Sequence, residues 1–456
     1  MANEALVKKS IVAVKKESKF NTDPTISSTN VIRVAEINVN DEYEQIKWDE
    51  VVNTKDEMPA LRGAESVSGD ITINMRSCAT EGAAPEGDVL YECALGSKSQ
   101  STASTCAASC TTTLIKVKAG DGSKFAVGDA LAVIIPTATT YTTTSGSTTT
   151  VIKFANDPAD FAIGDVVQVP NGAGTSLIEA TQITAIDHSA KTITVSPALT
   201  GAPDSGVTVK KATIEVTWIT SKSTDDLSIS PTLSAAPDQY TDLRAGTFYK
   251  FTLNDLPSFW LTYWRGDVVE ENYGGNKISQ LEMDLTIGQI VKPKFTFGGV
   301  SCTKASGSYS LGSPTLTSGY PLVAMSQSIK IGGTTYNCDR FNLRITNEIY
   351  DDKDITSSGI KQKIHTGRKV EGSFSLLHRS LDIYEMFKNE TTAEAVIIIG
   401  RNGFVTGQCV ALRIPKMKFV KTPVGADNKL FKYDVSWEAD IGTVGSEDTI
   451  TSLAFL

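Results

Sequence analysis

The chain repeats itself once, and this duplication is the feature that most limits how it can fold. Three short motifs return in the same order and with similar spacing in the second half. NDEYE at Asn40–Glu44 returns as NEIYD at Asn347–Asp351, VSGDITINM at Val67–Met75 as VEGSFSLL at Val370–Leu377, and LYECALG at Leu90–Gly96 as IYEMFKN at Ile383–Asn389. One match of this kind means little, but three in order predict two copies of one structural unit.

A strand, a turn and a second strand recur late in each copy. Residues 278–297 read ISQLEMDLTIGQIVKPKFTF, and residues 414–437 read IPKMKFVKTPVGADNKLFKYDVSW. Apolar and polar residues alternate along both segments, which predicts strands with one face on a core. In the first strand the apolar set is Leu281, Met283 and Leu285, and the acidic set on the opposite face is Glu282 and Asp284.

Each copy also contains one candidate for a short helix, Gly87–Ser97 in the first and Ser380–Lys388 in the second. Ser380 is a suitable N-cap residue. The side chains of Ile383 and Phe387 then share a face with Met386, which predicts packing against a sheet rather than a cofactor site. Each unit is therefore expected to contain strands, one short flanking helix, and further strands.

A different repeat interrupts the first copy. FAVGD at Phe125–Asp129 returns as FAIGD at Phe161–Asp165, and each lies between two short strands with a glycine in the turn. We therefore predict a small β domain inserted into the first unit. The predicted organisation is unit one at 1–104 and 213–305, the insert at 105–212, a linker at 306–317, and unit two at 318–456.

Composition excludes several classes of protein. Long runs with helical periodicity are scarce and Gly, Ser and Thr recur throughout, which predicts a mainly β fold. The formal net charge is −9, so the chain lacks the basic character of a conventional nucleic-acid-binding protein. No apolar run approaches the roughly 18 residues of a membrane-spanning segment. The N-terminus also lacks the apolar run of about 7–15 residues that a secretory signal contains.

No motif indicates catalysis, a cofactor or a metal site. No two of the three histidines stand at metal-ligand spacing. The seven cysteines are scattered and odd in number, so reduced thiols are expected, with a disulfide or metal at Cys106 and Cys110 as the lesser alternative. The acidic segment 350–354 (YDDKD) lacks the central glycine and the downstream glutamate of a calcium loop. The chain is therefore not expected to be an enzyme.

Several longer segments, in their order along the chain, carry a family resemblance. They are RGAESVSGDITINM, LYECALG, YWRGDVVEENYGGNKISQLEMDLTIGQIVKPKFTFGG, IGGTTYNCDRFNLRITNEI, GRKVEGSFSLL, and LRIPKMKF followed by FKYDVSWEAD. As an ordered set they resemble the tail tube (major tail) proteins of long-tailed, siphovirus-like bacteriophages, in the type with two fused units. The insert departs from the family's basic pattern, and such additions typically lie on the outside of the tail.

The resemblance implies a fold, an assembly and a set of partners. Each unit is expected to be a β-sandwich, and two fused units imply homotrimeric rings with pseudo-sixfold symmetry that stack into a tube. Phage DNA would pass through the lumen during ejection without specific binding. The other implied partners are the tape measure protein, the tail terminator and the distal tail proteins, with no membrane. The protein is expected in the virion tail, after assembly in the host cytoplasm.

The resemblance also implies two sets of functional residues. A wall that DNA passes should not hold phosphates, so Glu282 and Asp284 are expected to face the lumen, although an outer-sheet position stays open. The segments 40–66 and 347–369 are predicted as long charged loops that reach a neighbouring subunit or ring. Their candidate contact residues are Asp41, Glu42, Glu44, Lys47, Asp49, Glu50, Asp351, Asp352, Lys353, Asp354, Lys361 and Lys363.

Two alternatives stay open at this point. One is another structural virion protein with a β fold, namely a capsid decoration protein, a fibre or an adhesin, which would lack a pair of tube units. The other is a carbohydrate-active enzyme or module, which needs paired carboxylates and exposed aromatic side chains. Trp260, Tyr263 and Trp264 form the best such cluster, but alternation places both tryptophans on one strand face, which favours a core or an interface.

Overall fold

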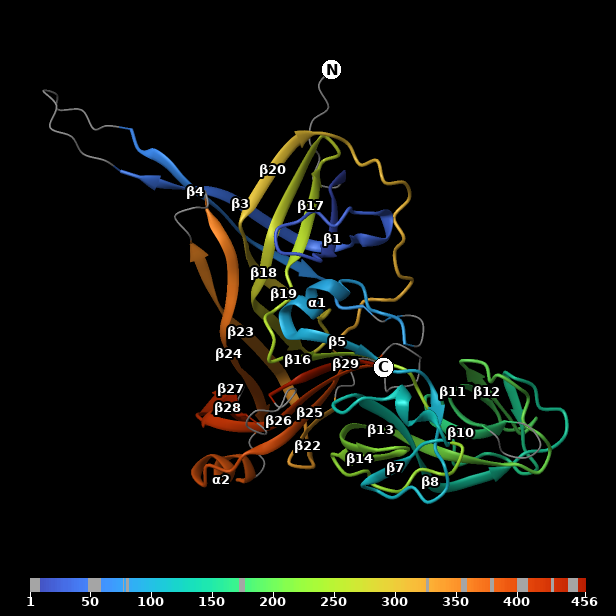
Figure 1. The fold of residues 1–456 in the computed structure, drawn as a ribbon. Helices are drawn as coiled ribbons and strands as arrows, with labels where there is room; N and C mark the ends of the chain where they lie inside the picture. Colours follow the sequence, from blue (N-terminus) through green and yellow to red (C-terminus); the bar gives the residue numbers. More distant parts are fainter. Residues whose placement is uncertain are drawn as a thin grey trace, which may run out of the picture.

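The computed structural model shows an almost entirely β protein, as the sequence predicts (Figure 1). The residues that it describes are 9–47, 59–76, 78, 82–171, 177–324, 328–353, 359–377, 381–399, 409–427, 430–441 and 450–456. Within these ranges there are two α-helices, α1 (Asp88–Leu95) and α2 (Asp382–Lys388), at the two predicted places, and two short 3-10 helices, Ser28–Asn30 and Asp121–Lys124. None of the described helices is long and apolar enough to cross a membrane.

The first unit is a sandwich of two sheets that share one long strand, β18. Its strands are β1 (Ile11–Lys16), β2 (Val31–Ile32), β3 (Val34–Ile46), β4 (Leu61–Ile73), β17 (Phe259–Arg265), β18 (Val269–Thr286), β19 (Lys294–Gly299) and β20 (Ser301–Ser306). One sheet runs β2-β1-β17-β18-β20 and the other runs β3-β4-β19-β18. Phe259 and Phe297 pack edge to face between the sheets, with ring centroids 5.4 Å apart. Helix α1 packs into the same core through Leu90 and Tyr91.

The second unit repeats this plan. Its strands are β21 (Ser328–Ile331), β22 (Thr334–Tyr336), β23 (Cys338–Lys353), β24 (Ile360–Leu377), β25 (Ala393–Ile399), β26 (Val410–Lys421), β27 (Val424–Asp427) and β28 (Leu430–Ala439). One sheet runs β22-β21-β25-β26 and the other runs β23-β24-β28-β26, with β27 continuing β26 along β28. The last strand, β29 (Ser452–Phe455), links β26 to β16 (Thr247–Phe251), which pairs with β5 (Gly96–Gln100).

A glycine at the same place in each unit explains why one motif occurs twice. Gly69 of β4 pairs with Phe297 of β19, and Gly372 of β24 pairs with Trp437 of β28. Each aromatic ring lies over its glycine: a Cβ atom would stand 2.9 Å from the Phe297 ring at Gly69 and 2.5 Å from the Trp437 ring at Gly372. The VSGD and VEGS motifs therefore mark the point where the second sheet of each sandwich closes over its core.

Pairing with these glycines gives the register of the duplication, which agrees with the VSGDITINM match and differs from the NDEYE match. Val39 lies opposite Gly69 and Leu343 lies opposite Gly372, so the INV of β3 corresponds to the FNL of β23. Asn40 thus corresponds to Arg344, three residues from the Asn347 that the NDEYE motif indicates. The match of residue 278 to residue 414 is also shifted. Ile278 pairs with Phe297, and Phe419 pairs with Trp437, so residue 278 corresponds to residue 419 rather than to residue 414.

The inserted segment forms a separate eight-stranded sheet. Its strands are β7 (Leu114–Lys116), β8 (Ala130–Thr142), β9 (Val151–Lys153), β10 (Val166–Asn171), β11 (Leu177–Asp187), β12 (Thr192–Ser196), β13 (Thr208–Ser223) and β14 (Asp226–Ser230). Their order is β7-β14-β13-β10-β11-β12-β9, with β8 also paired to β13. A small ladder of β6 (Ser104–Thr105) and β15 (Asp242–Leu243) borders this sheet.

The tandem repeat in the insert adopts the same geometry twice. Phe125 and Phe161 are buried in two separate small cores. The carboxylates of Asp129 and Asp165 each accept a backbone hydrogen bond of 2.8 Å from the residue three positions earlier. The glycine before each aspartate has a positive φ, of 86° and 96°, which a residue with a side chain rarely adopts. The two copies of F-A-x-G-D are thus equivalent turns in one sheet.

The insert emerges from the tip of a hairpin and packs on the second unit. Gln100 of β5 lies opposite Thr247 of β16, so the insert leaves and re-enters the fold at adjacent points. The predicted end at residue 212 falls inside β13, and the strands of the insert and its bordering ladder span Ser104–Leu243. The division into domains stays a prediction, with this later end.

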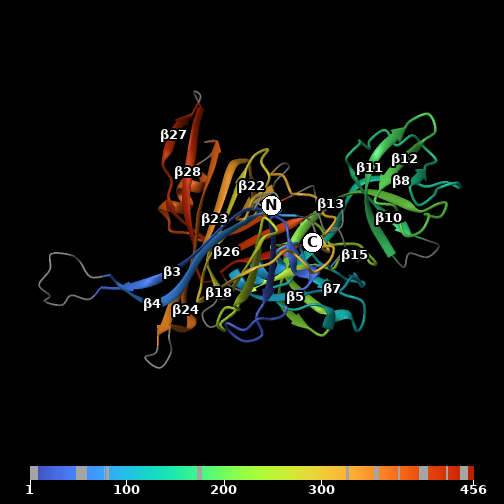
Figure 2. The ribbon, with the colours of Figure 1, turned by 90° about the horizontal axis from the view of Figure 1, so that it is seen from above.

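An apolar contact fixes the insert against the β25–β26 sheet of the second unit. Trp218 and Val216 of the insert share a buried cluster with Val396 and Ala411 of that sheet. The guanidinium of Arg413 lies 5.7 Å from the centre of the Trp218 ring. The insert and the β3–β4 hairpin lie on opposite sides of the molecule (Figures 1 and 2).

Candidate functional site

One continuous sheet crosses the boundary between the two units. Strand β18 of the first unit pairs with β23 of the second along Gln280–Thr286 and Arg340–Thr346. The combined sheet therefore runs β3-β4-β19-β18-β23-β24-β28-β26 through both units. We call the β18–β23 contact the internal joint. It makes the two units one surface instead of two independent domains.

The two faces of this sheet differ as the alternation in β18 predicts. Leu281, Met283 and Leu285 are buried in the shared core. The side chains of Glu282 and Asp284 point to the other face and are 37% and 44% exposed. We call this other side the polar face. The structure thus confirms which face of the strand carries the carboxylates; that this face lines a lumen stays a proposal.

The carboxylates on the polar face are paired across the internal joint, which the sequence did not reveal. Arg344 forms an ion pair with Glu282 at 3.1 Å, and Arg340 donates a hydrogen bond of 2.7 Å to Asp284. This hydrogen bond and the negative charge of Asp284 raise the pKa of Arg340. Residues 340–344 read RFNLR, so the alternation of the sequence predicts that both arginines share one face of the strand. The sequence does not predict that they lie opposite β18, because that position depends on pairing between distant segments.

Other charges on the polar face are also balanced. Lys294 lies 3.8 Å from Asp70 on the neighbouring strand. Lys369 lies 2.8 Å from Glu371 and 2.9 Å from Glu438, and hydrogen bonds to these carboxylates raise its pKa to about 12. The polar face therefore presents mixed, mutually paired charges, rather than the unpaired acidic set expected from β18 alone.

Both outer edges of the combined sheet are unpaired within the described part of the chain. Strand β3 pairs only with β4, and the end of β26 with its continuation β27 pairs only with β28. Unpaired strand edges promote association with other chains unless they are covered or used. Apolar side chains gather on the β26–β28 edge; Val420, Val424, Leu430 and Phe431 are exposed by 40%, 49%, 56% and 66%.

Comparison with known families accounts for this architecture. Residues 8–439 match the family described as phage tail tube protein. This chain belongs to the phage tail tube protein family. Membership implies self-assembly into a tube and a place in the virion tail, and the family is structural rather than enzymatic. A comparison with curated proteins finds no match.

The segments predicted as long loops of this tail tube protein are paired strands over their described parts. Residues 40–46 and 61–66 extend β3 and β4 into an arm that projects from the sandwich (Figure 2). Residues 347–353 and 360–369 extend β23 and β24 in the same way. We call them the first and second arm. Alternation is weak in both segments, so their charge favoured a loop, whereas cross-strand hydrogen bonding holds them extended.

Several predicted contact residues hold the arms within the tail tube subunit itself. Asp41 accepts a 2.6 Å hydrogen bond from Lys304, which lowers the pKa of Asp41. Asp351 pairs with the buried amino group of Lys363 at 2.6 Å. Glu44 of the first arm lies 3.6 Å from Lys353 of the second. These residues therefore brace the arms as well as being candidates for contacts between subunits.

The remaining predicted contact residues divide into two groups. Glu42, Lys47, Asp352 and Lys361 lie on the described parts of the arms, whereas Asp49, Glu50 and Asp354 fall outside the described residues. The contacts of these residues with other subunits stay predictions. The arms also carry exposed apolar side chains. Ile46, Leu61 and Tyr350 are 50%, 56% and 61% exposed.

The features that would suit an enzyme or a carbohydrate site do not converge. Trp264 is buried and packs edge to face on Tyr309 at 5.1 Å. Glu271 is also buried and accepts a 2.5 Å hydrogen bond from Arg265. Among the described residues, no group of three or more His, Cys, Asp or Glu side chains could hold a metal ion. All seven cysteines lie in the described part of the chain, and none of them forms a disulfide.

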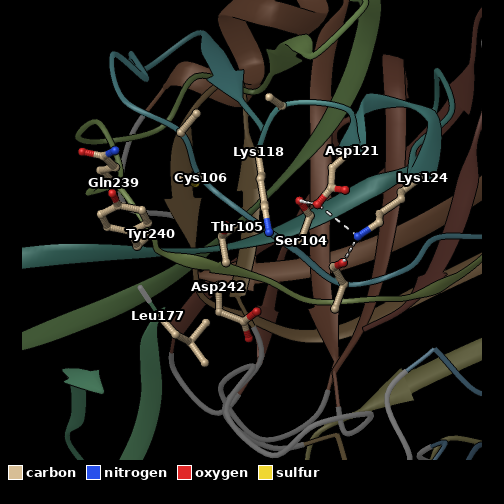
Figure 3. A pocket seen from close by; sticks show the side chains of 13 residues that line it. Ser104, Thr105, Cys106, Lys118, Asp121, Lys124, Leu177, Gln239, Tyr240 and Asp242 are labelled. Atoms are coloured by element: carbon tan, nitrogen blue, oxygen red, sulfur yellow. Dashed lines mark hydrogen bonds and ion pairs between the residues drawn. The ribbon is translucent and has the colours of Figure 1, made fainter. Parts of the chain in front are cut away.

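A pocket of about 570 Å³ lies in the insert, away from the polar face (Figure 3). One carboxylate of its wall is held by neighbouring side chains: Asp121 accepts a 2.8 Å hydrogen bond from Ser104 and pairs with Lys124 at 3.0 Å. These contacts lower the pKa of Asp121.

Proposed function

We propose that this tail tube protein closes into rings through the two open edges of its combined sheet, and that the rings stack into the channel for DNA ejection. The observation that carries the proposal is the single sheet with one buried face, one polar face and two unpaired edges. The edges differ, so a contact between them is head to tail. A head-to-tail contact that closes on itself generates a ring.

We further propose that three chains form one ring. Each chain supplies two equivalent units joined by β18–β23, so three chains present six units around the channel.

The polar face then forms the wall of the lumen, with Glu282 and Asp284 turned inward. Its arginines and lysines are paired with carboxylates, which leaves few cations free to bind DNA phosphates. At about 0.15 M salt the remaining fields reach only about 8 Å.

The proposed tube has ends and contents that require other proteins. We infer contacts with the tape measure protein inside the growing tube, with the tail terminator at one end, and with the distal tail proteins at the other. Assembly would take place in the host cytoplasm before the tail joins the virion. The arms, which extend beyond the sandwich, are the proposed contacts to the adjacent subunit and ring.

Negative-stain electron microscopy of the purified protein tests this proposal. Incubation at high concentration should give tubes, and averaged end-on views should show six wall units with three peripheral densities for the insert. Six inserts per ring would replace the trimer by a hexamer. A protein that stays monomeric under all conditions that polymerise tail tubes would contradict the proposal as a whole.

A further inference from the structure

We propose that residues 421–427 of one chain pair antiparallel with residues 36–42 of the next chain, in the register of the internal joint. This inference rests on the proposed ring and specifies how its subunits meet. We call this contact the external joint. It places residue 424 opposite residue 39, residue 425 opposite residue 38, and residue 421 opposite residue 42.

The internal joint provides the template for this register. Met283 lies opposite Leu343, Asp284 opposite Asn342, and Leu285 opposite Phe341, with no bulge along the seven pairs. A duplicated protein that forms a ring must make the same kind of contact twice, once within the chain and once between chains. The partners at the second contact are then the strands equivalent to β18 and β23.

The equivalence of β18 with β26–β27 is fixed by matching irregularities. A β-bulge lies between Ile278 and Gln280 where β18 pairs with β19, and another lies between Phe419 and Lys421 where β26 pairs with β28. After the bulge, β26 and β27 keep one register along β28, with Lys421 opposite Ser436 and Val424 opposite Tyr433. Residues 421–427 therefore take the place of residues 280–286 of β18.

The equivalence of β3 with β23 rests on a second pair of matching bulges. One lies between Val34 and Glu36, and the other between Cys338 and Arg340. Together with the glycine pairing described above, they place residues 36–42 of β3 on residues 340–346 of β23. Both halves of the external joint are thus located by hydrogen-bonded pairs within the chain, independently of the sequence motifs.

Burial differs between the two joints, because the internal joint is formed within the single chain and the external joint is open in it. Met283 is 2% exposed at the internal joint, whereas its equivalent Val424 is 49% exposed. Pro423 lacks an N–H group, but it does not block the contact, because its backbone faces β28. Its carbonyl accepts a hydrogen bond of 3.1 Å from the Asp434 N–H. Backbone groups of one residue point to the same side of an antiparallel strand, so the groups of Pro423 face β28 and those of Val424 face outward.

The charges at the two edges add one opposite-charge pair and oppose one wrong pairing. Residues 36–42 of β3 carry three acidic residues and no basic one, namely Glu36, Asp41 and Glu42. Residues 421–427 carry Lys421 at one end and Asp427 at the other. The external joint sets Lys421 opposite Glu42 and Asp427 opposite Glu36, so the charges favour it at one end only. Two β3 edges would instead bring acidic residues together, which disfavours a symmetric contact between them.

Disulfide trapping in assembled tubes tests the register. Gly425 lies opposite Asn38 in the proposed joint, and a Cβ atom at Gly425 would have no neighbour closer than 3.8 Å. The variant G425C/N38C should form covalent dimers and trimers under mild oxidation, which dithiothreitol reverses on a gel. The matched control, G425C/N40C, shifts the cysteine by two residues on the same face, where the pair is diagonal. Diagonal Cα atoms lie roughly 7–8 Å apart, beyond the usual span of a disulfide.

The outcomes separate this inference from the proposed function. Wild-type protein that forms no tubes contradicts the ring itself. Tubes in which the shifted control cross-links as well as or better than G425C/N38C, or in which neither pair cross-links, overturn the register while the ring stands. If G425C/N38C folds but does not assemble, V424C/V39C reads the same register, and absence of its cross-link in tubes would also overturn the inference.

Discussion

Single residues explain why the same short motif occurs twice in the chain. Gly69 and Gly372 carry no side chain because the rings of Phe297 and Trp437 lie over them. A Cβ atom at Gly372 would also stand only 2.0 Å from the carbonyl oxygen of Asn342. Neither glycine needs an unusual backbone angle, so the constraint is close packing between neighbouring strands.

Replacing Gly372 by alanine is expected to destabilise the second unit. The added methyl group must displace the Trp437 ring or the backbone of β23, and overpacking of this kind lowers the free energy of unfolding by about 1–3 kcal/mol. Gly359→Ala is the control, because a Cβ atom there meets nothing within 4 Å. Urea unfolding of the monomers measures the difference; equal midpoints for the two variants would contradict the packing argument.

Charge pairing on the polar face gives a second prediction at this scale. In E282Q/D284N, Arg344 and Arg340 lose their carboxylate partners. Tubes of this variant should retain short duplex DNA at low salt, and the retained fraction should fall as salt rises, because freed cations bind phosphates. Wild-type tubes should retain little.

The control for this experiment is Asp226→Asn, which frees Lys116 in the insert instead. It changes the charge of the protein without changing the polar face, so its tubes should behave like wild type in a DNA co-sedimentation assay. Equal DNA retention by wild-type, control and double-variant tubes would show that the paired arginines do not face the channel.

At the scale of elements, the two arms are extensions of strands and not loops. Each is held by backbone pairing and by a few ion pairs, while its apolar side chains Ile46, Leu61 and Tyr350 remain exposed. Such side chains gain little from the subunit's own core. Their burial requires another chain, which agrees with an arm that completes its contacts only in the tube.

Shortening the first arm should therefore separate folding from assembly. Replacement of residues 44–64 by an Asn-Gly turn removes exposed surface but leaves the core positions of β3 and β4 in place. The unfolding temperature of the monomer should change by only a few degrees, as expected for an exposed segment, and tube formation should be lost. Replacement of the insert turn 144–147 by Asn-Gly is the control and should still give tubes. Long tubes from the arm-shortened protein, seen by electron microscopy, would contradict this role.

For the whole molecule, the insert is a docked domain rather than a loosely tethered one. Its Trp218 is buried against the β25–β26 sheet of the second unit, and Ser230 donates a 3.0 Å hydrogen bond to Glu394 of that sheet. The open edges of the combined sheet are formed by other residues, 36–42 of β3 and 421–427 of β26 and β27. The structure thus separates the surface used for the insert from the surfaces proposed for the ring and the channel.

Removal of the insert should preserve tube formation if the exposed contact is made polar. Residues 103–243 can be replaced by a Gly-Ser turn, because the N–H of Ser101 already bonds to the carbonyl of Gly246 at 3.0 Å. With V396T and I398T added, the protein should form tubes of smaller outer diameter. The control keeps the insert and carries only these two substitutions. A folded, monodisperse deletion protein that makes no tubes would show that the insert contributes to the wall.

The sequence by itself determined the mainly β class, the duplication, the two helices, the tandem turns of the insert, and the opposite faces of Leu281 and Glu282. These features follow from local periodicity and glycine placement, which act over a few residues. It placed the glycine motif in register but misplaced the NDEYE match by three residues and also shifted the match of residues 278 and 414, since short motifs can slide along an alternating strand. It also read the arms as loops and ended the insert inside β13.

Only the tertiary structure decided which distant strands meet. The pairing of β18 with β23 brings Arg340 to Asp284 and Arg344 to Glu282, and this turns an apparently acidic strand into a neutralised surface. The same pairing shows which edges remain open and in which register the next chain can bind. Hydrogen bonds between strands far apart in the chain carry no local signature, because the backbone groups that form them are the same in every residue except proline.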